Sequence, residues 1–420
     1  MFLVRQRVGL CEQDTRSGPL HWGEAVILRS VEELPLKPGN RVLVRVDYNI
    51  PVNEEGLITD DARIKGTVDT LQYILGKGAI PIIISHWGRP QGDPHPDKSL
   101  ARVVPELQKI LHHRVNFLAQ PFAETTRASV AASQSDELFL LENLRFHAGE
   151  RTNDAEFARA LAAYADYYVN DAFPVSHRKQ ASVSALPSLF KTPAAGFSLL
   201  REVEYFSRLI HAPEKPYVVI IGGRKIEDKV RSLRFLLDKV DEVLVGGASA
   251  FTVLRARGFQ VGYSLVNEDL IDEMDDIADS EKVKLPTDFI AAPSYAEPDK
   301  SEVVPAHAFP EDLQGFDIGP ETTKAFCSSV LEASTVLWFG PLGAYEERAF
   351  SKGSLEVTRA MAEATKKGAT TVTGGGDSLA MLRLFSFKDS LSHASIGGGA
   401  CLKFMEGAEL PGIAPLVKER

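Results

Sequence analysis

The sequence has 420 residues, of which 44% are hydrophobic and 25% are charged, a balance typical of soluble globular proteins. A chain of this length exceeds what one hydrophobic core ordinarily serves, so we expect two domains. The formal net charge of −10 argues against a general nucleic-acid or membrane-surface role, and no apolar run approaches the ~20 residues that span a bilayer. The three cysteines show neither metal-ligand spacing nor a disulfide pattern, which favours a cytoplasmic location.

Strands and helices alternate along the chain after an N-terminal extension. Residues 1–25 lack the apolar core of a signal peptide, and we expect an extension of unknown role. The alternation predicts an α/β fold with mainly parallel sheets. The first predicted elements are a strand at 41–47, a helix at 64–77 and a strand at 79–85.

Polar side chains follow both of these strands. Asp47 and Asn49 come after the first strand, and His86 and Arg89 come after the second. Because ligands bind beyond the carboxyl ends of parallel strands, these residues should share one rim, which Arg63 could also reach. Two arginines and a histidine in one crevice indicate an anion site, most simply for phosphate plus carboxylate.

The rest of the N-terminal half continues the alternation. Ser99 suits the N-cap of a helix, and the loop after the last strand carries His177 and Arg178. A helix at 198–210 is long enough to connect two domains. The other predicted elements are helices at 100–112 and 155–165 and strands at 137–141 and 166–171.

In the C-terminal half, predicted strands run into glycine-rich turns. Such turns let backbone N–H groups approach an anion closely, and the dipole of a following helix favours negative charge. Lys225 and Lys229, four residues apart, are predicted to share a helix face and bracket a polyphosphate. Asp377 could hold Mg²⁺, although both standard glycine-rich nucleotide signatures are missing. These strands are predicted at 217–222, 242–245, 335–338 and 370–373.

Nine short motifs give the chain a resemblance to the phosphoglycerate kinase family from about residue 31 to residue 416. Each motif is modest alone, but nine in the family's order are highly specific. They are Arg45-Val-Asp-Tyr-Asn49, Asp60-Asp-Ala-Arg63, His86-Trp-Gly-Arg-Pro90, Glu142-Asn-Leu-Arg-Phe146, Asn170-Asp-Ala-Phe173, Gly222-Gly-Arg-Lys225, Gly340-Pro-Leu-Gly343, Gly374-Gly-Gly-Asp377 and Ser392-His-Ala-Ser395.

The resemblance implies two Rossmann-like, three-layer α/β/α domains that face each other across a cleft. It also implies reversible phosphoryl transfer between 1,3-bisphosphoglycerate and ADP, giving 3-phosphoglycerate and ATP, after hinge closure. We expect a monomer that binds these small molecules and neither nucleic acid nor membrane. The implied parts are an acid-substrate domain at 26–197, an interdomain helix at 198–211, a nucleotide domain at 212–404, and a tail at 405–420 that returns to the first domain.

The resemblance also assigns residues to three roles. Arg63, Lys225, Gly376 and Gly399 would be catalytic, and Asp377 would hold the Mg²⁺ of Mg-ADP or Mg-ATP. The acid substrate would bind at Asp47, Tyr48, Asn49, Arg63, His86, Trp87, Gly88, Arg89, Arg145 and Arg178. The nucleotide would bind at Lys225, Lys229, Gly247, Gly315, Glu346, Gly375, Gly376, Asp377 and Ser378.

Taken singly, each residue type has a simpler structural explanation. An arginine most often makes a surface ion pair, a lysine lies on a solvated helix face, and a glycine run forms a turn without a ligand. The site interpretation rests on their joint position at strand ends in both halves.

Four residues depart from the family pattern, and they keep two alternatives open. Pro174 stands where the family has Gly, Gln180 replaces a His, Arg224 replaces Ala, and Phe339 replaces an Asn that can bond a nucleotide. One alternative is a related protein that has lost turnover and acts as a binding or regulatory module. The other is a kinase for a different phosphorylated carboxylic acid.

Overall fold

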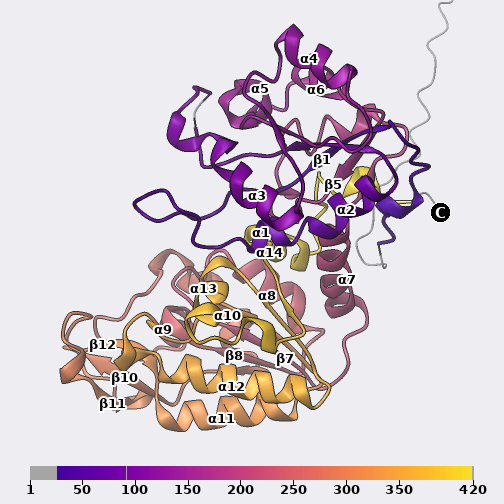
Figure 1. Ribbon diagram of the computed structural model, residues 1–420. Coiled ribbons are helices and arrows are strands. Elements are labelled where there is room, and N and C mark those ends of the chain that lie inside the picture. Colours follow the sequence, from indigo (N-terminus) through magenta and orange to yellow (C-terminus); the bar gives the residue numbers. More distant parts are fainter. Residues whose placement is uncertain (1–25, 91, 419–420) are drawn as a thin grey trace, which may run out of the picture.

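The structure, a computed structural model, describes residues 26–90 and 92–418, so the expected extension at 1–25 lies outside the described residues. Figure 1 shows two lobes stacked one above the other and joined along one side by a helix. We call residues 26–196 with the tail at 405–418 the N-lobe, and residues 212–404 the C-lobe. Each lobe contains a six-stranded sheet, which confirms the predicted α/β class with mainly parallel sheets.

The N-lobe sheet is entirely parallel, in the order β3-β4-β2-β1-β5-β6. Its central strands are apolar on both faces because helices cover both sides: alternate residues of β1 enter two different hydrophobic clusters. The strands are β1 Arg41–Arg45, β2 Ile80–Ile84, β3 Asn116–Leu118, β4 Phe139–Leu141, β5 Tyr167–Asn170 and β6 Ala194–Ala195.

The helices of the N-lobe correct one prediction. The single helix expected at 64–77 is two helices, because Thr67 bonds to the Ile64 carbonyl at 2.8 Å and lies 2.9 Å from the buried Tyr48 hydroxyl. Ser99 does cap the next helical segment, accepting from the Ala101 N–H at 3.2 Å. That segment begins as a 3-10 helix, Leu100–Val103. The α-helices are α1 Ala62–Lys65, α2 Val68–Gly76, α3 Val104–Leu111, α4 Glu124–Ala131, α5 Ala148–Arg151 and α6 Ala155–Ala162.

The C-lobe is built around a second parallel sheet in the order β15-β14-β13-β7-β8-β9. A small antiparallel sheet, β11-β10-β12, is appended to it and was not predicted. The parallel strands are β7 Tyr217–Ile221, β8 Glu242–Val245, β9 Val283–Lys284, β13 Thr335–Phe339, β14 Thr370–Gly374 and β15 His393–Ala394; the antiparallel ones are β10 Asp288–Ala292, β11 Glu302–Pro305 and β12 Gln314–Ile318.

Helices cover the C-lobe sheet and begin at several of its glycine-rich turns. None of the described helices has the length and hydropathy of a membrane-crossing segment. The helices are α8 Val230–Leu237, α9 Gly247–Ala256, α10 Asp275–Ala278, α11 Pro320–Glu332, α12 Lys352–Lys366, α13 Gly376–Leu384 and α14 Gly399–Met405.

Helix α7, Phe197–His211, runs between the lobes and contacts both (Figure 1). Its first N–H donates to Thr70 Oγ1 of the N-lobe at 2.9 Å. Further along, Glu202 accepts from Ser395 Oγ of the C-lobe at 2.6 Å. Phe206 stacks on Phe173 with ring centroids 5.9 Å apart, so one hydrophobic cluster continues through the helix into both lobes.

The chain crosses between the lobes a second time, after α14. The tail packs on the N-lobe, where Asn170 Nδ2 donates to the Gly412 carbonyl at 2.7 Å and the Arg29 N–H donates to the Leu416 carbonyl at 2.9 Å. The N-lobe therefore contains both ends of the described chain.

Candidate functional site

Four residues meet where β1 and β2 of the N-lobe end. Arg63 Nη1 lies 2.6 Å from Asp47 Oδ2 and donates to the Asn49 carbonyl at 3.0 Å. The Asn49 side chain in turn accepts from the Gly88 N–H at 2.8 Å. These contacts orient Arg63, which remains partly exposed, so its remaining donors can reach a ligand.

Arg45 lies beneath this rim and is completely buried, although the sequence analysis assigned it no role of its own at the site. Its guanidinium bonds Ser182 Oγ at 2.8 Å and lies 3.1 Å from His86 Nδ1. Burial, reinforced by the charge of Arg45, lowers the pKa of His86 well below its usual value. His86 is therefore neutral near pH 7. A charged residue inside an apolar strand was the available signal for Arg45.

Arg145 is the most unusual cation of the N-lobe. Its Nη1 donates to the Gly88 carbonyl at 2.5 Å, but its Nε and Nη2 are buried and have no hydrogen-bond partner among the described residues. Burial, together with the charges of Arg178 and Arg45, lowers the pKa of Arg145 to about 10. Buried donors without partners are costly, so this geometry points to an anionic ligand that would satisfy them.

The charge around Arg145 is strongly one-sided. Burial lowers the pKa of Arg178, and the charge of the nearby Arg89 lowers it further. The rim thus has mainly one carboxylate, that of Asp47, to balance four arginines: Arg63, Arg89, Arg145 and Arg178. We call these four arginines with Asp47 the arginine rim. A ligand with two or more negative charges would balance it.

Two expected substrate residues do not present their side chains to this rim. The Tyr48 side chain is buried at Thr67, and Trp87 is buried in the hydrophobic core. Trp87 instead accepts from the Asn143 side chain through its carbonyl at 2.8 Å. Tyr48, Trp87 and Gly88 therefore shape the rim through the backbone.

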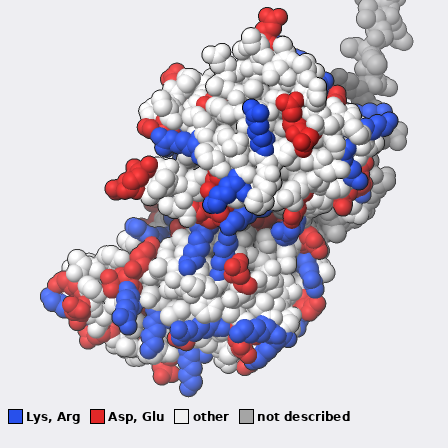
Figure 2. Space-filling model, viewed as in Figure 1, with Lys and Arg blue, Asp and Glu red and all other residues white. Residues whose placement is uncertain are grey.

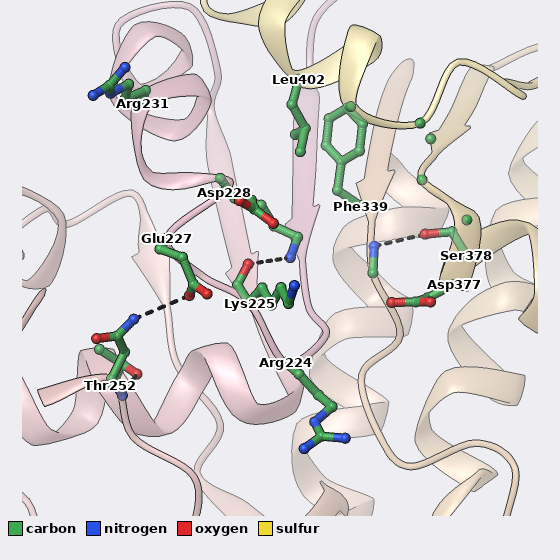
Figure 3. A pocket seen from close by; sticks show the side chains of 18 of the residues that line it. Arg224, Lys225, Glu227, Asp228, Arg231, Thr252, Phe339, Asp377, Ser378 and Leu402 are labelled. Atoms are coloured by element: carbon green, nitrogen blue, oxygen red, sulfur yellow. Dashed lines mark hydrogen bonds between the residues drawn. The ribbon is translucent and has the colours of Figure 1, made fainter. Parts of the chain in front are cut away.

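The C-lobe has a cavity of about 1210 Å³ (Figure 3), and His177, the neighbour of Arg178 in the N-lobe, is among the residues that line it. Its floor is the turn between β14 and α13. Gly375 has a φ of +99°, a conformation that favours glycine, and α13 starts at the next residue. The Gly340 N–H is already bonded to Ser378 Oγ at 2.8 Å. Residues around the cavity include Lys225, Lys229, Gly374, Gly375, Gly376, Asp377, Ser378 and Gly399.

Lys225 and Lys229 line this cavity but do not share a helix face, so that prediction is wrong. Gly223, with a φ of +80°, donates to the Pro341 carbonyl at 2.6 Å, and this contact with a distant turn delays helix α8 until after Lys229. Lys229 Nζ donates to the Lys225 carbonyl at 2.7 Å, and burial lowers its pKa. Lys225 Nζ has no bond with any described residue, and Figure 3 shows it directed into the cavity on the side of Asp377.

A second, more apolar cavity of about 630 Å³ adjoins the first. Phe251, Phe289 and Tyr295 supply aromatic walls, which suits a flat aromatic ring. Gly315 is required there because a Cβ atom would lie 2.2 Å from the Phe251 ring. Expected nucleotide residues around this cavity are Gly247, Gly315 and Glu346. Arg224 and Asp377 line both cavities, so a nucleotide could place its base in one and its phosphates in the other.

Besides Arg224, three other residues depart from the family pattern, and they take different positions. Pro174 is the second residue of the 3-10 helix Phe173–Val175, where no N–H is needed. Gln180 is buried, with its Oε1 atom lacking a partner among described residues. Phe339 is only 1% exposed and belongs to the hydrophobic cluster that includes Cys401. In Figure 3 its ring lies beside Leu402, so it forms an apolar wall of the phosphate cavity.

The two lobes also come near each other at Gly399, the first residue of α14. A Cβ atom on Gly399 would lie 3.9 Å from His177 Nε2 of the N-lobe, and His177 also lines the C-lobe cavity. Burial and the charge of Arg178 lower the pKa of His177 to about 4, so it too is neutral near pH 7. The sequence showed His177 only as a loop residue, because its nearness to Gly399 and to the C-lobe cavity depends on how the two lobes are placed.

Among the described residues, no cluster of three or more His, Cys, Asp or Glu could hold a metal by itself. Asp377 is a single carboxylate at the junction of both cavities. One carboxylate with substrate phosphates and water is a donor set that suits Mg²⁺. The residues present therefore fit a metal that arrives with a nucleotide.

An arginine rim on one α/β lobe and a glycine-lined cavity on the other define a two-lobe phosphotransferase. The sequence profile described as phosphoglycerate kinase matches residues 31–408. The phosphoglycerate kinase of Thermosynechococcus vestitus is 42% identical over 90% of this chain and 96% of its own length. That of Thermosipho africanus is 41% identical over 93% of this chain and 98% of its own.

Solved structures agree with these relatives. Phosphoglycerate kinase from Coxiella burnetii superposes with a TM-score of 0.83 at 36% identity, covering 93% of this chain and 99% of that one. Phosphoglycerate kinase from Pyrococcus horikoshii superposes with a TM-score of 0.80 at 28% identity, covering 93% of this chain and 98% of that one. The chain belongs to the phosphoglycerate kinase family, and it is a phosphotransferase.

Proposed function

We propose that the protein transfers a phosphoryl group reversibly between 1,3-bisphosphoglycerate and ADP, giving 3-phosphoglycerate and ATP. The buried Arg145 guanidinium carries this proposal, because its two unpaired nitrogens call for an anion beside three further arginines. The acid would occupy the arginine rim and Mg-ADP or Mg-ATP the glycine-lined cavity. We further propose a cytoplasmic monomer.

We propose that each lobe binds a different substrate. Residues 26–197 bind the acid, residues 212–404 bind the nucleotide, helix 198–211 acts in the hinge, and the tail at 405–420 supports the acid domain. Since each substrate is held by a different lobe, hinge closure is needed to align them and exclude water.

The chemistry requires little covalent participation by the protein. In the ATP-consuming direction the nucleophile is a carboxylate with a pKa of about 3.5, which is already ionised near pH 7 and needs no general base. Catalysis is then positioning and stabilisation of charge on the migrating group. Lys225 from the C-lobe and Arg63 from the N-lobe supply positive charge, and the N–H groups of Gly376 and Gly399 supply hydrogen bonds. When bound at Asp377, Mg²⁺ would neutralise charge on the nucleotide phosphates.

A coupled assay of the purified protein with ADP and 1,3-bisphosphoglycerate tests this proposal. We expect steady ATP formation that saturates in both substrates. Absence of turnover at high protein concentration would favour the binding or regulatory alternative. A strong preference for another phosphorylated acid under saturating ATP would favour the second alternative, which rests on the buried Gln180 and on Pro174.

Arg224 is expected to add a phosphate contact opposite the apolar wall of Phe339. It is exposed, makes no ion pair or hydrogen bond with the described residues, and lines both cavities. We expect Arg224→Ala to weaken ADP binding by about 3- to 10-fold, because a charge-assisted bond to phosphate is lost. Titration calorimetry with ADP, pyrophosphate and adenosine measures this effect.

The three titrations separate the possible roles of Arg224. If the Arg224→Ala variant binds ADP and pyrophosphate more weakly but binds adenosine as before, Arg224 contacts the phosphates. If its affinity for adenosine falls equally, Arg224 lies at the base, which would contradict this expectation. Arg231→Ala is the matched control. Arg231 lines the same cavity, but its side chain points away from Lys225 and Asp377 in Figure 3.

A further inference from the structure

An ion pair spans the cleft between the two lobes. Arg383 of α13 pairs with Asp60, which lies just before α1. Among ion pairs within residues 26–90 and 92–418, this is the one that joins the N-lobe to the C-lobe directly; the others near the hinge involve α7 or the tail. Figure 1 shows α1 and α13 on the facing surfaces of the lobes. In Figure 2, charged side chains of both signs gather where the lobes meet.

Asp60 is tied to the helix that carries Arg63. Its Oδ1 accepts from the Ala62 N–H at 3.1 Å, and Ala62 is the first residue of α1. The second carboxylate oxygen is the one that pairs with Arg383. The Asp60 side chain is only 15% exposed, which limits how far it can turn away.

Arg383 is tied in the same way to the phosphate-binding end of the C-lobe. It stands near the end of α13, about two helical turns from Gly376, where that helix begins at the cavity floor. A helix transmits displacement along its axis as a rigid element. A displacement of Arg383 therefore also moves Gly376, Asp377 and Ser378 at the start of the same helix.

We propose that Asp60 and Arg383 are positioning residues for phosphoryl transfer, because their ion pair sets the separation of α1 from α13 and thereby of Arg63 from the nucleotide phosphates. Neither side chain is assigned a contact with substrate. This inference rests on the proposed function for its kinetic consequence, but its structural consequence can be measured without turnover.

The pair need not be strong to matter. Partly exposed ion pairs contribute little to folding, but hinge states differ by only a few kcal/mol or less, so a weak cross-cleft contact can change their populations severalfold. Because both partners are partly accessible, salt should screen the contact. The effect of salt then distinguishes an electrostatic positioning role from packing.

A double-mutant cycle tests the proposal. Asp60→Asn removes the charge but keeps an oxygen for the Ala62 N–H, and Arg383→Gln removes the opposite charge from a helix that tolerates glutamine. We expect each single change to lower kcat by about 3- to 10-fold, with both KM values nearly unchanged. The kcat of the double variant should be no lower than that of either single variant. High salt should lower kcat of the unaltered protein toward that of the variants.

The same proteins are compared by small-angle scattering without substrates. We expect the single and double variants to have the same radius of gyration, and this radius should be larger than that of the unaltered protein. Arg359→Gln is the control, because Arg359 pairs with Glu356 within α12 at 2.7 Å and should change neither measurement. Additive losses in kcat, or an unchanged radius of gyration in every variant, would overturn the proposal. Absence of turnover in the unaltered protein would overturn the proposed function instead, leaving the scattering comparison to decide on the pair.

Discussion

Replacement of Lys225 by alanine is expected to lower kcat by about 10²- to 10³-fold, the usual consequence of removing one preorganised group that stabilises transition-state charge. Its ammonium group has no bond with any described residue and points into the phosphate cavity, so it is available to the migrating phosphoryl group (Figure 3). KM for ADP should change far less, because this contact tightens mainly in the transition state. Steady-state kinetics in both directions provides the measurement.

Lys352→Ala is the matched control for this experiment. Lys352 is exposed at the start of α12 and is not among the residues that line either cavity, so its loss should leave kcat unchanged. An undiminished kcat in Lys225→Ala would remove Lys225 from the catalytic role. A large rise in KM with constant kcat would make it a ground-state binding residue.

Replacement of Arg145 by methionine is expected to have opposite effects on binding and on folding. KM for the phosphorylated acid should rise by about 30- to 1,000-fold, as is usual when one partner of a buried, charge-assisted contact is removed. Without ligand, Tm should stay the same or increase, because a guanidinium with two unpaired buried nitrogens is replaced by an apolar side chain. Kinetics and thermal unfolding, with and without 3-phosphoglycerate, measure both effects.

The ligand-induced increase in Tm should disappear in Arg145→Met, because stabilisation by a ligand depends on its affinity for the folded state. Arg151→Met is the control, since Arg151 is exposed at the end of α5 and close in sequence. A fall in Tm with unchanged KM would mean that Arg145 serves the fold rather than the substrate.

The strands and their glycine-rich ends were predictable because they depend on short-range patterns. Continuous apolar runs such as Tyr217–Ile221 are typical of strands buried on both faces, and β8 has the predicted bounds. The resemblance to the family then ordered these elements into two lobes. The antiparallel sheet escaped prediction because its strand β11 is mostly exposed and lacks a clear apolar pattern.

The errors at the site have a common physical cause, which is contact between distant parts of the chain. Thr67 breaks the expected helix through its contact with Tyr48, and the Gly340–Pro341 turn holds back the start of α8. Neither contact is visible in a window of neighbouring residues. Arg45 was missed for a similar reason, since only the fold places His86 beside it.

The return of the tail to the N-lobe has a consequence for how the chain is made. Asn170 Nδ2 donates to the Gly412 carbonyl at 2.7 Å, so the N-lobe lacks one of its buried bonds until nearly all residues have left the ribosome. The C-lobe, in contrast, uses one continuous stretch of chain. Because domains generally fold as units during synthesis, we expect the lobe that is translated first to be the one that is completed last.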